Sequence, residues 1–120
     1  MEEFQAAAGE GRTRVSLWAS SLGDDLIVHI YNENAHVGAV AVAEYDQQNQ
    51  RTSVSVLTRL GHKDDAISQK VAHTISKATK RAVCVIAGFH IEDITAEEIS
   101  QVLVNAGAVV ERFLEARKKT

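Results

Sequence analysis

The sequence predicts a single α+β domain of order ββββαβα, with a mainly antiparallel sheet and two helices packed on one of its faces. Three observations lead to this fold. Apolar and polar residues alternate along the first half of the chain, which is typical of half-buried strands. Beyond about residue 63 the apolar residues follow helical spacing instead, interrupted by one continuous apolar run. A length of 120 residues suits one domain.

Four strands are predicted before the first helix. In the first, Val15, Leu17 and Ala19 alternate with polar or larger neighbours. The predicted strands cover residues 12–20, 25–31, 37–45 and 51–58. Because the turns between them are short and polar, we expect an antiparallel meander. Residues 1–11 are small and polar and contain glycine, so they are expected to form a flexible N-terminal tail, which leaves 12–120 as the folded domain.

The second half of the chain predicts a helix, a strand and a further helix. Ile67, Val71 and Ile75 lie on one stripe of a helix over about residues 63–79. Residues 81–88 are predicted as a strand, because after Arg81 the run is continuously apolar, as in a strand covered on both faces. Thr95 and Glu98 form a capping box that begins the last helix. The buried stripe of that helix is Ile99, Val102, Leu103, Ala106, Val110, Phe113 and Leu114.

Composition narrows the class of protein. The net charge of −3, with acids and bases interspersed, argues against a nucleic-acid platform, which should present a basic face. The one cysteine, Cys84, lies in an apolar run, so it is expected to be an inert core side chain in a reducing compartment. No apolar run is long enough to span a bilayer. We therefore expect a cytoplasmic protein.

Strand directions bring three histidines to one edge of the predicted sheet. His36 precedes the third strand, His62 follows the fourth, and His90 follows the fifth. The first helix carries the chain back across the sheet, so these three positions and both helix N-termini should meet at the same edge. Such an edge suits an anion, because free amides and helix dipoles favour negative charge there. Lys63 adds a full positive charge.

Glycines and acids at this edge support two different interpretations. Glycines 38, 61 and 88 would let a ligand approach the backbone closely. Acids in the same segments could instead satisfy the helix amides themselves, which would make the edge purely structural. These acids are Asp64, Asp65, Glu92 and Asp93. Both interpretations remain open from the residues alone.

Other uses of the same side chains are weaker. Three histidines can hold zinc with an open position, but their spacing matches no standard zinc motif. We see no nucleophile motif, Walker loop or dinucleotide fingerprint, so catalysis is not expected. His29 and His73 are expected to have surface or interface roles. Trp18, Ile27 and Tyr31 lie opposite the core-facing series, which indicates a homodimer through the exposed sheet face or an uncovered face with a few apolar residues.

Three motifs resemble those of the LpdD-like family of prenylated-flavin chaperones. These are small D subunits and stand-alone relatives associated with gallate-type decarboxylases. The motifs are His36-Val37-Gly38-Ala39-Val40, Gly61-His62-Lys63-Asp64-Asp65 and Ala87-Gly88-Phe89-His90-Ile91 through Ile94-Thr95, with Asn105 in the last helix. Phe89 departs from the aliphatic residue expected at its position. The family's fold is similar to that of proteasome assembly chaperones, which dimerise.

The resemblance implies a non-catalytic protein that holds prenylated flavin mononucleotide, or flavin mononucleotide, and delivers it to a partner decarboxylase. The implied cofactor-binding residues are His36, Gly38, Gly61, His62, Lys63, Gly88, His90 and Thr95. The alternative is a protein-assembly chaperone or interaction module of the proteasome-assembly type without a small ligand. A zinc-dependent enzyme is the third and least favoured possibility.

Overall fold

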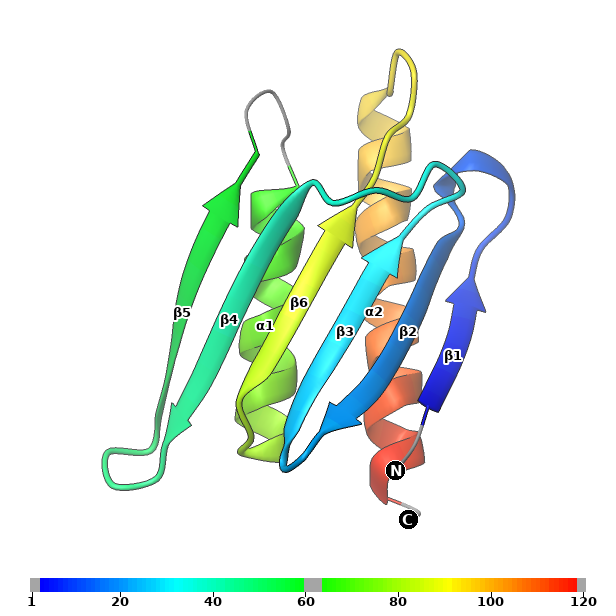
Figure 1. Ribbon diagram of the computed structural model, residues 1–120. Coiled ribbons are helices and arrows are strands. Elements are labelled where there is room, and N and C mark those ends of the chain that lie inside the picture. The colour runs from blue at the N-terminus through cyan, green and yellow to red at the C-terminus, as the bar shows by residue number, and fades with distance from the viewer. Residues whose placement is uncertain (1–2, 60–63, 119–120) are drawn as a thin grey trace.

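A computed structural model describes residues 3–59 and 64–118 of the chain. It is one six-stranded mixed sheet with two helices on one face, which confirms the predicted α+β class (Figure 1). The strands are β1 Glu3–Ala8, β2 Val15–Leu22, β3 Asp25–Tyr31, β4 Ala39–Asp46, β5 Arg51–Thr58 and β6 Val83–Gly88. The helices are α1 Asp65–Thr79 and α2 Ala96–Lys118, with a short 3-10 turn at Gly11–Thr13.

The N-terminal segment is a strand, so the prediction of a tail over residues 1–11 is wrong for Glu3–Ala8. β1 pairs antiparallel with β2 along its whole length, from Glu3 opposite Ser20 to Ala8 opposite Val15. The ring of Phe4 packs against that of Phe113 on α2, with centroids 5.4 Å apart. Strand pairing and this contact order a segment whose own polar and alanine-rich composition carries little strand signal.

The order of the strands also departs from the predicted meander. The sheet runs β1-β2-β3-β6-β4-β5, so β6 lies between β3 and β4, which do not pair with each other. β6 is parallel to β3 and antiparallel to β4. The most apolar strand thus occupies the interior of the sheet, where both of its edges are paired and one face is covered by the helices, not both faces as its apolar run predicts. The connection 32–38 crosses the end of β6 to reach β4, and Gly38 N–H donates to the carbonyl of Ala87 at 2.9 Å.

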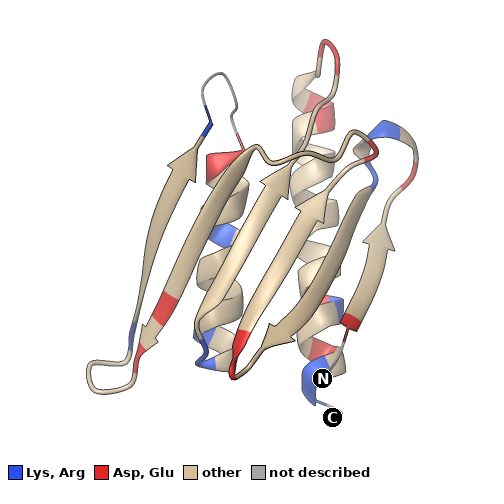
Figure 2. Ribbon diagram, viewed as in Figure 1, with Lys and Arg blue, Asp and Glu red and all other residues tan. Residues whose placement is uncertain are grey.

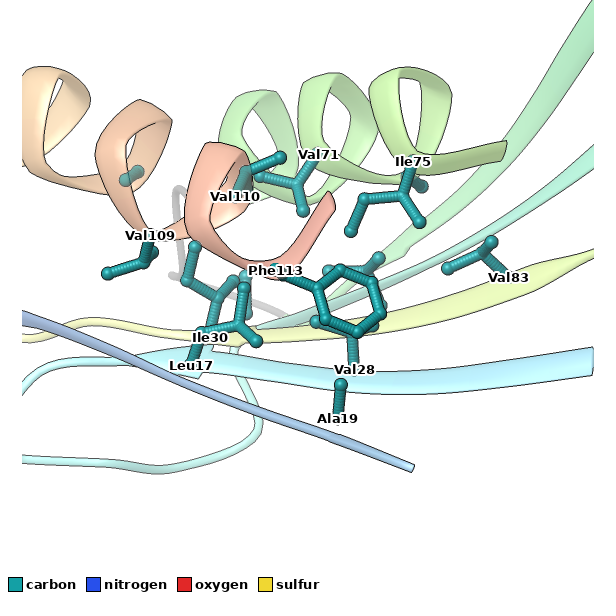
Figure 3. Close-up of a cluster of buried hydrophobic side chains, with 14 of the residues drawn as sticks. Leu17, Ala19, Val28, Ile30, Val71, Ile75, Val83, Val109, Val110 and Phe113 are labelled. Atoms are coloured by element: carbon teal, nitrogen blue, oxygen red, sulfur yellow. The ribbon is translucent and has the colours of Figure 1, made fainter. Parts of the chain in front are cut away.

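The core lies between the sheet and the two helices. Alternate residues of the strands point toward the helices, and Leu17, Val28 and Ile30 are at most 1 % exposed. Phe113 of α2 and Ile75 of α1 are fully buried against them (Figure 3). Each fully buried aliphatic or aromatic side chain contributes roughly 1.5–3 kcal/mol relative to exposure. This layer fixes the strand ends, and thereby the edge at which the histidines lie.

The other face of the sheet is not covered by a helix. Across the six strands the register aligns Gln5, Trp18, His29, Ile86, Val40 and Leu57 in one row of this open face. Leu57 is 78 % exposed, and Val42, one row away, is 50 % exposed. Figure 2 shows Lys, Arg, Asp and Glu concentrated on helices, loops and strand ends, with the middle of β2, β3 and β6 free of them.

Candidate ligand-binding site at the histidine edge

The histidine edge is the end of the sheet where β3 and β6 end and where β4, α1 and α2 begin (the upper end in Figure 1). It comprises the connection 32–38, Asp64 at the start of α1, and residues 88–95. The structure brings His36, Gly38, Gly88 and His90 to this edge, as the strand directions predict. Gly61, His62 and Lys63 lie outside the described residues.

Asn32 ties the two halves of the edge together. It is only 2 % exposed, its Nδ2 donates to the carbonyl of His90 at 2.9 Å, and its Oδ1 accepts the amide of His90 at 3.2 Å. Asn34 Nδ2 donates to the same carbonyl at 3.1 Å. A buried amide with both ends satisfied holds its partners in one arrangement. The backbone of His90 is therefore fixed against the connection that carries His36.

His36 lies beside a carboxylate that the chain buries. Its Nδ1 is 2.9 Å from the carbonyl of Asn34, and its Nε2 is 3.7 Å from Oδ2 of Asp64. The Asp64 side chain is 10 % exposed and accepts the backbone N–H of Phe89 at 3.2 Å. Because the Asn34 carbonyl can only accept, Nδ1 carries the proton in this arrangement. Nε2 then faces the Asp64 carboxylate.

The two described glycines of the edge, Gly38 and Gly88, allow close contact with other atoms of the chain. A Cβ on Gly88 would lie 1.7 Å from the carbonyl oxygen of His36, and one on Gly38 would lie 1.9 Å from Oδ2 of Asp64. Both distances are far below any allowed contact. The close backbone approach that these glycines permit is thus between the connection 32–38, β6 and the Asp64 carboxylate.

The two helix starts differ in whether a side chain caps their backbone amides. At α2 the predicted capping box is present: Thr95 N–H donates to Glu98 Oε1 at 3.0 Å, and Glu98 N–H donates to Thr95 Oγ1 at 3.1 Å. Arg12 Nε lies 2.6 Å from Glu98 Oε2. The Thr95 amide and then Arg12 lower the pKa of the Glu98 carboxyl. Thr95 and a carboxylate therefore already serve the amides of α2.

At α1 the N-cap residue, Asp64, makes no side-chain hydrogen bond to its own helix, because its carboxylate is turned toward Phe89. Orphan amides at a helix start attract anions. Arg59 directly follows β5 in the chain. Its backbone N–H donates to the carbonyl of Gly38, and its guanidinium donates to the carbonyl of Val37 at 2.9 Å. Sequence reasoning missed Arg59 as a member of this edge. Of the two helix starts, that of α1 is the one whose N-cap side chain leaves the amides uncapped, and it carries Asp65 in its first turn.

His90 and Phe89, the next two residues of the edge, differ in their exposure to solvent. The side chain of His90 is 59 % exposed, with Nε2 3.6 Å from Oε1 of Glu92. Phe89 is half-buried and packs against the core. An exposed imidazole can stack on a planar ligand. Thr95, by contrast, is engaged in the capping box of α2.

Within residues 3–59 and 64–118, no three His, Cys, Asp or Glu side chains come together as a metal site would require. His62, the third histidine of the predicted edge, lies outside those residues. Cys84 is half-buried on the open face of the sheet beside Ile27 and Val42, and burial raises the pKa of its thiol. A thiol in that state is a weak nucleophile at neutral pH.

Asn105, which the family motifs include, is away from the histidine edge. Its Nδ2 donates to the carbonyl of Thr13 at 2.9 Å, and it is 5 % exposed in α2. A Cβ on Gly9 would lie 2.2 Å from that same Nδ2. Asn105 therefore anchors the segment after β1 to α2, a structural role that depends on the N-terminal strand. The sequence carries no local signal for it.

The fold places the protein in the class of small α+β domains whose six-stranded sheet is covered on one face by two helices. A chain from the crystal structure of a chaperone complex for yeast 20S proteasome assembly superimposes with a TM-score of 0.61 at 16% identity, covering 99% of this chain and 98% of that one. At that identity the likeness shows the fold. No match was found among curated proteins.

The family follows from the sequence itself. Residues 9–118 match the prenylated flavin chaperone LpdD-like domain. The chain therefore belongs to that family, as its three motifs predicted. Among the described residues, no helix has both the length and the apolar character that crossing a bilayer requires.

Proposed function

We propose that this protein binds prenylated flavin mononucleotide, or flavin mononucleotide, at the histidine edge and delivers it to a partner decarboxylase without transforming it. The observation that carries the proposal is the start of α1, where the N-cap side chain is turned away from the helix amides and Arg59 lies nearby in the chain. The family membership supports a chaperone role.

The residues of the edge divide between the two ends of such a ligand. The amides of α1, with Lys63 immediately before them in the sequence and Arg59, would receive the phosphate. His62 and Gly61 adjoin that position in the sequence. His90 and Phe89 would contact the ring system, and His36 would lie beside the ligand. A flavin held there would supply the chemistry that the partner enzyme uses.

Anaerobic titration of the purified protein with reduced prenylated flavin mononucleotide tests the proposal. Lys63→Ala, His62→Ala and Arg59→Ala should each raise the Kd about 10-fold or more, because a hydrogen bond to a charged group is worth about 1.5–3 kcal/mol. His73→Ala and Lys77→Ala, on exposed positions of α1, are matched controls and should leave the Kd unchanged. Thermal melts verify folding. The absence of saturable binding by the unsubstituted protein, or equal effects of controls and edge variants, would overturn the proposal.

We further propose that two copies associate face to face through the open face of the sheet. Trp18, Val42 and Leu57 present apolar surface there that no described element covers. Val42→Asp should produce a monomer in sedimentation velocity, because it places a charge in the interface. Val104→Asp, at an exposed position on α2, is the control and should leave the sedimentation coefficient unchanged. A monomeric unsubstituted protein at high concentration would contradict this arrangement.

An assembly chaperone without a small ligand remains the second candidate, because the open face also suits a different protein. In that case capture of a partner decarboxylase would survive His36→Ala and Lys63→Ala and would be lost in Val42→Asp. If the protein delivers a cofactor, flavin transfer to the decarboxylase should be lost in His36→Ala and Lys63→Ala and should survive in Val42→Asp. The two functions are therefore separated by the same three variants.

A further inference from the structure

The outer strand β5 is an unprotected sheet edge. Among residues 3–59 and 64–118 it pairs with β4 alone, through the register from Ala39 opposite Thr58 to Asp46 opposite Arg51. An eight-residue edge strand turns about four N–H and about four C=O groups outward, because antiparallel bonds alternate between the two sides. Proteins usually guard such edges with proline, inward-facing charge, a bulge or a covering element. The stretch Thr52–Thr58 has neither proline nor a charged residue.

The opposite edge of the sheet is guarded. β1 has six residues, and the guanidinium of Arg112, reaching from α2, donates to the carbonyl of Ala7 at 2.6 Å. The end of β1 is followed by Gly9, which has a φ of +87° and turns the chain away from the sheet. The difference between the two edges shows that β5 is the one at which a further strand can pair.

A groove runs beside β5 on the helix side of the sheet. It has a volume of about 450 Å³ and is lined by Val54 of β5 and by Ala66, Gln69, Lys70, His73 and Thr74 of α1. A strand added to β5 would lie about 4.8 Å beyond it. Every second side chain of that strand would point toward α1 and enter this groove. The groove thus gives the added strand side-chain contacts as well as backbone hydrogen bonds.

The charges of the groove select its occupant. Lys70 and His73 line it, and none of its six lining residues is acidic. Arg51 adds a further positive charge at the start of the strand. Carboxylates on the inward face of an added strand would therefore meet complementary charge. A second copy of this chain is disfavoured, because antiparallel pairing of two β5 strands would bring the Lys70 and His73 side chains of both copies to the same groove.

We propose that β5 is a docking edge for an extended, acidic segment of a partner protein, which adds to the sheet as a seventh strand. The backbone groups of β5 supply affinity, and the Lys70–His73 groove supplies selectivity for carboxylates at alternate positions. This inference concerns a different surface from the histidine edge and the open face. It does not depend on the cofactor proposal.

The test uses two synthetic eight-residue peptides and the full chain without flavin. One peptide has glutamate at every second position with threonine or valine between, and the other has lysine in place of each glutamate. The glutamate peptide should bind at least about 10-fold more tightly by fluorescence anisotropy. Its amide shift changes in 15N-labelled protein should fall on residues 51–58 and on α1 around Lys70. Lys70→Glu combined with His73→Glu should reverse the preference between the peptides, and both positions are exposed, so the fold should be retained.

Three results would overturn the proposal. Equal affinity for the two peptides would remove charge selection by the groove. Shift changes confined to the histidine edge or to the open face would place binding elsewhere. Concentration-dependent shift changes on β5 without peptide, accompanied by dimer formation, would assign the edge to a second copy. Because flavin is absent throughout, failure here leaves the cofactor titration unaffected.

Discussion

Nε2 of His36 lies 3.7 Å from Oδ2 of Asp64, and the same carboxylate oxygen accepts the backbone N–H of Phe89. These contacts join the connection before β4, the start of α1 and the end of β6. The carboxylate that sequence reasoning assigned to a helix start is therefore a brace between three elements. Its orientation is what leaves the amides of α1 without a side-chain cap.

Replacement of Asp64 by alanine should lower the free energy of unfolding by about 1–3 kcal/mol, because it leaves the half-buried Phe89 N–H without its acceptor. Asp64→Asn keeps an acceptor at that position and should cost less. Urea denaturation of the three proteins measures the difference. Equal stability of the alanine variant and the unsubstituted protein would show that the carboxylate does not brace the edge.

Two glycine substitutions should have opposite effects. Gly88→Ala should destabilise the protein by about 1–3 kcal/mol, because its Cβ meets the His36 backbone and forces the connection 32–38 to shift. Gly107→Ala, on the surface of α2 with no atom within 4 Å of its added Cβ, should stabilise by about 0.5–1 kcal/mol. Thermal melts of both variants test the pair. A Gly88→Ala protein as stable as the unsubstituted one would contradict the packing described for this loop.

The capping box of α2 should make stability depend on acid. Thr95 and then Arg12 hold the pKa of Glu98 below its ordinary value of 4.5, so the folded state favours the carboxylate. The resulting stabilisation is complete above that value and is lost as pH falls through the folded-state pKa. Glu98→Gln should therefore show a shallower fall in Tm below pH 4.5. Thr95→Ala should cost about 1 kcal/mol at neutral pH, as loss of an N-cap usually does. If Tm fell equally with pH in Glu98→Gln and in the unsubstituted protein, this role for Glu98 would be excluded.

His29 should lower the stability of the folded protein in mild acid. Burial lowers its pKa below the ordinary 6.5, and its buried Nε2 has no hydrogen-bond partner among the described residues. The unfolded chain then binds this proton more readily, so stability falls as pH drops below about 6.5. His29→Phe removes the group, and the aromatic ring can still stack on Tyr31, whose ring centroid is 4.2 Å away. The variant should lose less Tm than the unsubstituted protein between pH 7.5 and 5.5, and equal losses would contradict the assignment.

Cys84 should report on the open face of the sheet. Burial raises the pKa of its thiol, so alkylation by iodoacetamide at pH 7 should be slower than that of a free thiol. In a face-to-face dimer, alkylation should slow further as the protein concentration rises. Val42→Asp should abolish this concentration dependence. A rate that is independent of concentration in the unsubstituted protein would speak against the dimer proposed here.

The period-two and helical patterns were enough to predict four strands and both helices, because these elements bury one face each. The strand at 83–88 was predicted from its continuous apolar run instead. β1 and the position of β6 were not predictable in this way. β1 depends on its pairing with β2 and on the contact between Phe4 and Phe113. Insertion of β6 between β3 and β4 depends on which strand best tolerates full burial, and hairpin-length turns carry no information about that choice.

The meeting of His36 and His90 at one edge followed from strand direction alone, since alternation of direction survives a change in strand order. What that edge is made of was decided only by the tertiary structure. Asn32 and Asp64 are buried there, and glycines 38 and 88 admit the chain's own atoms. A sequence determines periodicity and direction because they are properties of each segment. The partner of a buried polar group comes from a distant segment, here between 25 and 58 residues away, and packing alone selects it.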